Sequence, residues 1–170
     1  MGILSGNPKD EPLHYGEAMA VWTSSLTAKS MIAGYSTLIN HAGDQDLKKL
    51  IEEAIKMGKS EMTELDQVLK ENGIALPPAP PERPEAKLDD IPAGARFQDP
   101  EIAANLSRDV ATGLSACSMA MGQSIREDIG AMFAKFHAEK ARLGGECLRL
   151  NKEKGWLVPP PLLHDPVEKK

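Results

Sequence analysis

The side chains whose types and spacing come nearest to a reactive site are Glu61, Asp109 and His137. If the helical segments that carry them pack as two hairpins aligned from their turns, the three fall at about the same height. Two carboxylates and an imidazole at one level are donors that can bind a single divalent ion. One interpretation of the chain is therefore a metal-dependent oxidase or ion-binding protein with a degenerate site.

Nearby basic residues offer a simpler explanation of the acidic side chains. Lys29, Arg108 and Lys140 are close enough in the same alignment to form ion pairs. Glu61 and Glu139 lie near apolar seams, where a charge requires a partner. We therefore predict solvated or ion-paired side chains in preference to a metal site, and we assign no metal ligand, catalytic residue or cofactor.

The other histidines have local roles available to them. His14 and Glu17 share a helix face three residues apart, which favours a hydrogen bond between them. His41 falls in the last turn of the same helix, where a partly positive imidazole is stabilised by the helix dipole. His164 belongs to the C-terminal tail and is expected to be exposed.

Cys117 and Cys147 lie in separate helical segments among apolar neighbours. Neither belongs to a Cys-x-x-Cys pair or to the Cys/His spacing of a zinc site. We expect buried free thiols. A disulfide between them stays open, as does a pairing of Cys147 with a histidine, although no oxyanion-hole element is evident.

Four stretches of apolar residues at steps of three and four predict the helices that must position these side chains. They cover about residues 12–41, 44–72, 99–121 and 125–154. The short links within the first and second pairs require each pair to pack antiparallel. The chain of 170 residues therefore predicts an all-α, four-helix bundle in a single domain.

Capping signals mark the expected helix ends. Starts are predicted at a proline or at side chains able to accept hydrogen bonds from free N–H groups: Pro12, Asp44, Asp99 before Pro100, and Ser124 with Glu127. Stops are predicted at Gly43, Gly73 and Gly155. Trp156 is expected to fold back onto the last helical turn.

Residues 74–98 separate the two hairpins and contain six prolines, which exclude a helix and favour an extended chain. At about 3.1 Å per residue, this stretch can traverse a bundle roughly 45 Å long. A tether between independent domains is rejected, because neither hairpin alone covers its apolar stripe. We predict a crossover along the bundle, and an extended surface tail at residues 157–170.

Two hairpins joined by one long crossover have the connectivity of ferritin-like bundles. Such bundles often hold two iron or manganese ions through a Glu on each of two helices and a Glu-x-x-His on each of the others. None of the four predicted helical segments contains a Glu-x-x-His. The connectivity is therefore predicted without its usual ligand set.

Bulk properties exclude several function classes. The net charge of −5 disfavours sequence-independent binding to nucleic acid, which requires a basic surface. No apolar run approaches the roughly 20 residues of a membrane span, and the N-terminus lacks the basic and apolar regions of a signal peptide. Gly6 stands where the myristoylation pattern requires Ser or Thr. We expect a cytoplasmic protein without membrane or nucleic-acid partners.

Several stretches taken together carry a family resemblance: Glu11–Glu17, Ile32–His41 with Asp44, Gly122–Ser124 with Arg126 and Asp128, and Lys152–Trp156 before prolines. They resemble a family of uncharacterised, ferritin-like helical proteins of Bacillus and related spore formers. Some members carry the label "putative spore coat protein", similar to coat protein F. The match spans nearly the whole chain. The resemblance implies a ferritin-like fold, cytoplasmic synthesis and a place in the spore coat, and it supplies no catalytic residues.

Apolar residues outside the main seam of each helix indicate a second packing face: Met19, Met31, Ile74 and Met119. We therefore predict a non-catalytic structural or interaction protein that forms a homodimer and associates with other spore coat proteins. The metal-dependent oxidase remains the rival interpretation. A third is a small-ligand carrier with a pocket lined by Met132, Phe133 and Phe136, although these side chains are better explained as core.

Overall fold

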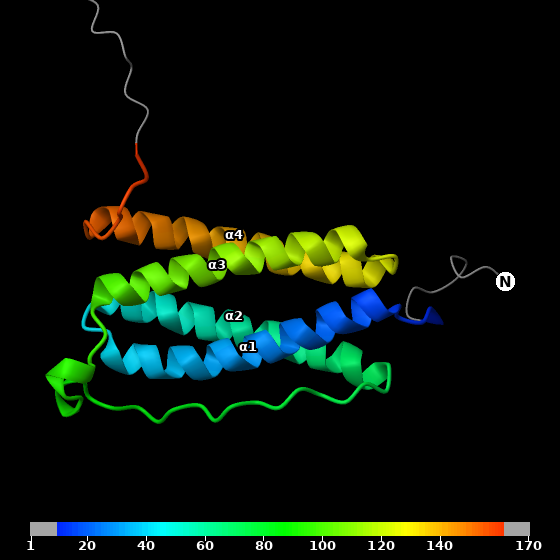
Figure 1. The fold of residues 1–170 in the computed structure, drawn as a ribbon, viewed down its shortest axis with the longest axis horizontal. Coiled ribbons are helices and arrows are strands. Elements are labelled where there is room, and N and C mark those ends of the chain that lie inside the picture. Colours follow the sequence, from blue (N-terminus) through cyan, green and yellow to red (C-terminus); the bar gives the residue numbers. More distant parts are fainter. Residues whose placement is uncertain (1–9, 162–170) are drawn as a thin grey trace, which may run out of the picture.

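The computed structural model describes residues 10–161, which form four α-helices and no strand (Figure 1). The helices are α1 (Tyr15–His41), α2 (Gln45–Glu71), α3 (Asp99–Gln123) and α4 (Glu127–Glu153). α1 and α2 form one antiparallel hairpin, and α3 and α4 form the other. The predicted all-α arrangement of two hairpins is confirmed. Among the described residues, none of the helices combines the length and apolarity that crossing a bilayer requires.

Two apolar clusters hold the hairpins together, one toward each end of the bundle. The first joins residues near the α1–α2 turn to the start of α3, including Leu47, Ile51, Ile102 and Leu106. The second gathers at the opposite end: Val21, Leu65, Leu69, Ile129, Phe133 and Phe136. Each fully buried side chain of this size contributes about 1.5–3 kcal/mol to stability. The hairpins are therefore docked mainly near their ends.

The proline-rich segment runs back along α1 before α3 begins (Figure 1). Because proline has no N–H, the segment offers mainly carbonyl oxygens, and side chains of α1 donate to them. Trp22 Nε1 lies 3.0 Å from the oxygen of Ala75, and Asn40 Nδ2 lies 2.9 Å from that of Pro84. Two short 3-10 turns, Leu88–Asp90 and Ala93–Ala95, complete the segment. The predicted crossover along the bundle is confirmed.

The first helix begins three residues later than predicted. Its N-cap is His14, whose Nδ1 accepts a hydrogen bond of 2.9 Å from the backbone N–H of Gly16. Glu17 returns the contact, since its carboxylate accepts from the backbone N–H of His14 at 3.2 Å. The predicted contact between His14 and Glu17 thus takes the form of a capping box, and Pro12 lies outside the helix.

The predicted starts of the third and fourth helices need correction. Gln98 is the N-cap of α3, in place of Asp99. The Ser124–Glu127 capping box does not form, because the Ser124 hydroxyl donates to the oxygen of Ala120 at 2.8 Å. α4 therefore begins at Glu127, two residues later than predicted, and α3 continues to Gln123.

Two of the three predicted glycine stops have the expected backbone. Gly73 and Gly155 have φ values of 68° and 71°, in the left-handed region that side chains with a Cβ rarely adopt. Trp156 then packs partly buried against the first core cluster, as predicted. Gly43 does not have a positive φ, and α1 ends instead at the extended residue Ala42. The predicted tail is described only to residue 161, where it is non-helical, and His164 lies outside the described residues.

Candidate functional site

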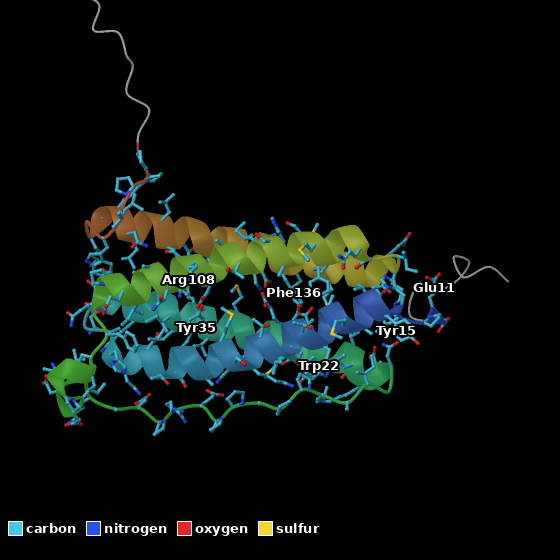
Figure 2. The ribbon with its side chains drawn as sticks, viewed as in Figure 1. Glu11, Tyr15, Trp22, Tyr35, Arg108 and Phe136 are labelled. Atoms are coloured by element: carbon cyan, nitrogen blue, oxygen red, sulfur yellow. The ribbon has the colours of Figure 1, made fainter. Side chains whose placement is uncertain are left out.

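A cavity of about 290 Å³ lies between the two core clusters, and all four helices contribute to its walls. Figure 2 shows Tyr35 and Phe136 in this region between the hairpins. Most of the wall is apolar, with Met57, Phe133 and Leu143 among its residues. Because protein interiors are normally packed as densely as organic crystals, open space of this size in mid-bundle calls for an explanation.

Small residues on several helices leave this space open. They are Ala28, Ala54, Gly58, Gly113 and Ala116. At Gly58, a Cβ would lie 3.2 Å from the Ile32 side chain, so this glycine permits close contact between α1 and α2. The cavity thus results from short side chains between helices that larger residues hold together at both ends.

The most buried ion pair of the cavity wall joins Glu61 on α2 to Lys140 on α4. The stem of Lys140 passes directly over Gly113, where an added Cβ would lie 2.8 Å from Lys140 Cε. Burial raises the pKa of Glu61, while the Lys140 ammonium opposes that shift. Lys140 Nζ also lies 5.8 Å from the centre of the Phe136 ring, within the range of a cation–π contact.

A second polar contact in the cavity joins the two hairpins directly. The Tyr35 hydroxyl on α1 donates to Asp109 Oδ2 on α3 at 3.1 Å. Burial raises the pKa of Tyr35 strongly, and the neighbouring Asp109 carboxylate adds to the shift. The phenol therefore remains a neutral donor at physiological pH.

Carboxylates also close both ends of the bundle, a feature that the sequence analysis missed. Glu17 Oε1 accepts hydrogen bonds of 2.8 Å from the backbone N–H groups of Ile125 and Arg126 in the α3–α4 turn. At the other end, the two oxygens of Asp99 accept from Gly43 and Asp44 in the α1–α2 turn, at 2.8 and 3.1 Å. Each turn is thus capped by the other hairpin.

Arg126 is almost fully buried beside Glu17, with 3% of its surface exposed. Its guanidinium makes a two-point contact with Asp128, at 3.0 and 2.7 Å, and donates to the backbone oxygen of Glu11 at 3.0 Å. The hydrogen bonds to Asp128 raise the pKa of Arg126 and lower that of Asp128. Two of the stretches that carried the family resemblance, 11–17 and 122–128, therefore meet at one end of the bundle.

Comparison with known proteins places the whole chain in one group. A family model described as "Protein of unknown function (DUF3231)" matches residues 1–168. The chain belongs to the DUF3231 family. It is 56% identical over 162 residues to the uncharacterized protein YvdQ of Bacillus subtilis strain 168, covering 95% of each chain. The family found by resemblance is thereby confirmed.

Solved structures agree with the fold of this DUF3231 protein. One is the crystal structure of a "putative spore coat protein" (BH2358) from Bacillus halodurans C-125, with a TM-score of 0.92 and 58% identity over 94% of this chain and all of that one. A conserved hypothetical protein, rv2844, from Mycobacterium tuberculosis has a TM-score of 0.67 at 14% identity, covering 81% of this chain and 98% of that one. The second similarity concerns the fold alone.

The structure separates the three residues first considered as metal ligands. Glu61 and Asp109 line the same cavity, but Glu61 contacts Lys140 and Asp109 contacts Tyr35. His137 is half-buried on α4 and is not among the residues that line the cavity. Within residues 10–161, no three His, Cys, Asp or Glu side chains are grouped so that they could hold one metal ion.

The basic residues considered beside these carboxylates take different partners. Lys140 pairs with Glu61, as the ion-pair alternative allowed. Lys29 pairs with Asp66 at 2.9 Å and donates to the oxygen of Pro77 in the crossover at 3.0 Å. Arg108 donates to Asn105 on its own helix at 2.8 Å.

The Glu-x-x-His pattern has one match in the chain, Glu11 to His14, whose glutamate precedes the first predicted helix. The structure places it at the end of the bundle, away from the mid-bundle cavity. There His14 Nδ1 caps α1, and its Nε2 lies 3.1 Å from the oxygen of Gln123. These two residues therefore take part in the hydrogen bonds at the end of the bundle and not in a mid-bundle metal site.

Both cysteines are buried and free, as predicted. Cys117 lines the cavity, and burial raises the pKa of its thiol. Burial also raises the pKa of Cys147, in the first core cluster, to about 11. Both thiols are therefore protonated at neutral pH.

Of the residues proposed for the carrier pocket, Phe133 and Phe136 line the cavity. Their rings meet edge to face, with centres 6.0 Å apart. Met132 instead packs against the second core cluster. Two of the three predicted residues therefore belong to the cavity wall.

One side of this DUF3231 bundle exposes almost no charge. α1 contains two residues of the Asp, Glu, Lys and Arg types, Glu17 and Lys29, and both are buried. α2 contains twelve such residues and α4 contains ten. In α3 the last such residue is Asp109, so that the helix is free of them from Val110 to Gln123.

The exposed residues of α1 and of the second half of α3 form what we call the uncharged face. From α1 it includes Tyr15, Met19, Thr23, Thr27, Ser30 and Gly34, and from α3 Ala111, Thr112, Ser115, Ala116, Met119 and Gly122. The α1 members fall within about 120° of one another around the helix. Thr23, Thr27, Thr112 and Ala116 also line the cavity, so the two stripes adjoin at its mouth.

Proposed function

We propose that this DUF3231 protein is a non-catalytic structural or interaction protein of the spore coat, that it acts as a homodimer, and that it associates with other coat proteins. The single observation that carries the dimer is the uncharged face. Charged side chains keep a solvent-exposed surface soluble and unassociated, and their absence over two neighbouring helices is typical of a surface with a partner.

A second copy is the occupant that suits this face best. The exposed members of the face carry no charge that a partner would have to match, and Asp109, half-buried at its edge, already accepts a hydrogen bond from Tyr35. The same patch on another copy can therefore pack against it with little desolvation of charged groups. Small residues such as Ala111, Ser115 and Gly122 alternate with the larger Met19 and Met119, and such surfaces allow helices to approach closely. Met19 and Met119, predicted to lie on a second packing face, are 64% and 63% exposed.

The other two residues predicted to lie on a second packing face, Met31 and Ile74, have a different role. Met31 and Ile74 pack partly buried against the core clusters of the same chain. The prediction that these two residues belong to a second packing face is therefore wrong. The proposed interface consists of the uncharged face without them.

Support for a place in the spore coat comes from one solved relative. The Bacillus halodurans protein with a TM-score of 0.92 is described as a putative spore coat protein. Its 58% identity to this chain makes a related role the simplest proposal. A fluorescent fusion followed through sporulation of Bacillus subtilis tests it, and we expect a ring at the forespore surface. A signal that stays diffuse from growth to spore release contradicts the assignment.

Light scattering coupled to gel filtration tests the dimer at micromolar concentration. We expect twice the mass of one chain for the unmodified protein. Met119→Glu places an unpaired charge in the interface, and we expect its dimer dissociation constant to rise at least about tenfold. Leu148→Glu on α4 is a matched control, since Leu148 is also an exposed apolar residue but lies among charged neighbours.

The control variant should retain the mass of the unmodified protein. A monomeric mass for the unmodified chain contradicts the dimer proposal directly. Equal dissociation of Met119→Glu and Leu148→Glu would contradict the assignment of the interface to the uncharged face.

A further inference from the structure

The mid-bundle cavity has the size of a ligand site. Its volume of about 290 Å³ is near the lower end of the range of known small-molecule pockets, roughly 300–1,000 Å³. One water molecule occupies about 30 Å³ of liquid, so the space corresponds to about ten non-hydrogen atoms. A molecule built on a single ring would fill it.

The walls favour an apolar body for such a molecule. Phe133 and Phe136 contribute aromatic surface from α4, and Met31, Met57 and Leu143 contribute aliphatic and thioether surface. Water in such a space finds few partners, because an ordered water requires two to four polar contacts. An apolar ligand gains contacts with walls that would otherwise face empty space.

The polar groups of the wall specify the charge of the ligand. Glu61 and Lys140 neutralise each other as an ion pair. Asp109 receives a hydrogen bond from the neutral hydroxyl of Tyr35, and none of the ion pairs between described residues includes Asp109. The wall therefore carries one carboxylate without a cationic partner, held in place by an aromatic donor.

We propose that the cavity binds a small organic amine with an apolar, ring-sized body, whose ammonium group pairs with Asp109. An ammonium group supplies the positive charge and the N–H donors that a carboxylate accepts most strongly. A ligand carboxylate is disfavoured, because Lys140 is already paired and Asp109 would repel it. The site uses residues of one chain only, so it stands independently of the proposed dimer.

The entrance to the site lies on the uncharged face. Thr23 and Thr27 on α1 and Thr112 and Ala116 on α3 are exposed and also line the cavity. A ligand can therefore enter between α1 and α3 without separating the hairpins at their capped ends. Dimer formation over this face would slow entry and exit of the ligand while leaving its contacts unchanged.

Isothermal titration calorimetry of the full chain with three probes of similar size tests the site. The probes are 2-phenylethylamine, the neutral 2-phenylethanol and the anionic 3-phenylpropionate. We expect the amine to bind at least about tenfold more tightly than the alcohol, and the carboxylate to bind most weakly. This series decides the question on the unmodified protein, without a variant that must fold.

Two variants then locate the amine. Asp109→Asn keeps the size and the acceptor for Tyr35 but removes the charge, and it should weaken amine binding about tenfold while leaving the alcohol unchanged. Asp89→Asn is the matched control on an exposed turn of the crossover, where the side chain is 97% exposed, and it should change neither affinity.

Three results would overturn the proposal. They are absence of amine binding at millimolar concentration, equal affinity for the amine and the alcohol, and tighter binding of the carboxylate. The last would show that a ligand pairs with Lys140 instead of Asp109. Each titration is run to equilibrium, so slow entry through a covered face would not change the measured affinity, and light scattering measures the oligomeric state separately.

Discussion

Glu17 and Asp99 occupy corresponding places at opposite ends of the bundle. Each lies in the first turn of the first helix of its hairpin, and each accepts two backbone N–H groups from the turn of the other hairpin. The two hairpins are therefore related as a structural repeat, and each completes the hydrogen bonding of the other. Docking is secured at both ends, which allows the centre to remain open around the cavity.

Replacing Glu17 should destabilise the fold more than replacing Asp99. Glu17 is 1% exposed, so Glu17→Ala leaves the backbone N–H groups of His14, Ile125 and Arg126 without this acceptor, and we expect a loss of about 2–3 kcal/mol in unfolding free energy. Asp99 is half-buried, and water can replace it, so Asp99→Ala should cost about 1 kcal/mol. Urea unfolding followed by circular dichroism measures both.

The control for these capping variants is Glu52→Ala on α2, because Glu52 is exposed. It should change the free energy of unfolding by no more than about 0.5 kcal/mol. If Glu17→Ala matched this control, the carboxylate would have no capping role.

Gly113 should be intolerant of a side chain because of Lys140. A Cβ at position 113 would displace the Lys140 stem and weaken its ion pair with Glu61. Gly145→Ala on α4 is the matched control, since nothing lies within 4 Å of its added Cβ, and it should stabilise the helix by about 0.5–1 kcal/mol. We expect Gly113→Ala to be less stable than this control by about 1 kcal/mol or more.

A double variant separates the clash from other effects of the added methyl group. In a Lys140→Ala background the two alanine substitutions should have the same effect, because the displaced stem is gone. A difference that persists in this background would place the cause elsewhere.

The thiol of Cys147 should react slowly in the folded protein. Because burial raises its pKa to about 11, roughly one molecule in a thousand carries the thiolate at pH 8, against about a quarter for an ordinary cysteine. In a Cys117→Ser background, reaction with a thiol reagent should accelerate about tenfold per pH unit between pH 8 and 10. Rapid reaction at pH 8 without denaturant would contradict the burial of this thiol.

The same shift predicts how stability depends on pH. The folded state holds the proton more tightly than the unfolded state, so the contribution of Cys147 is complete below the ordinary cysteine pKa of about 8.5. It should be lost as the pH rises from there to about 11. Urea unfolding at several pH values, compared between the unmodified chain and Cys147→Ala, isolates this contribution as a difference in slope.

The metal-binding interpretation has a direct test in elemental analysis of protein purified without chelator. Glu61 is paired with Lys140, and His137 does not line the cavity. We therefore expect less than one iron or manganese ion per chain, and the same metal content in His137→Ala. One tightly bound ion per chain, lost in His137→Ala, would establish the metal site instead.

Local signals in the sequence predicted the helices well. The apolar spacing placed all four, Asp44 caps α2 by accepting from Asp46 and Leu47, and Gly73 and Gly155 end their helices. The errors fall at ends where the partner is distant. Asp99 was assigned to its own helix, but its carboxylate serves the α1–α2 turn.

The candidate site was predicted only in part. Two of the residues considered, Glu61 and Asp109, do line one cavity, because helix length measured from the turns gives an approximate height. The rotation of each helix about its own axis could not be predicted in this way. That rotation determines that Lys140 passes over Gly113 to reach Glu61 and that His137 lies outside the cavity wall. A helix turns by 100° per residue, so a small error in rotation changes which side chains meet.

By itself, the sequence determined the four helices, their pairing into hairpins and the crossover. These depend on periodicity, capping and proline content, which act within a few residues of one another. Only the tertiary structure decided which carboxylate closes which turn, which lysine pairs with Glu61, and that a cavity remains at the centre. These contacts join residues 55 to 109 positions apart, and they form only when the two hairpins dock at one height and one rotation.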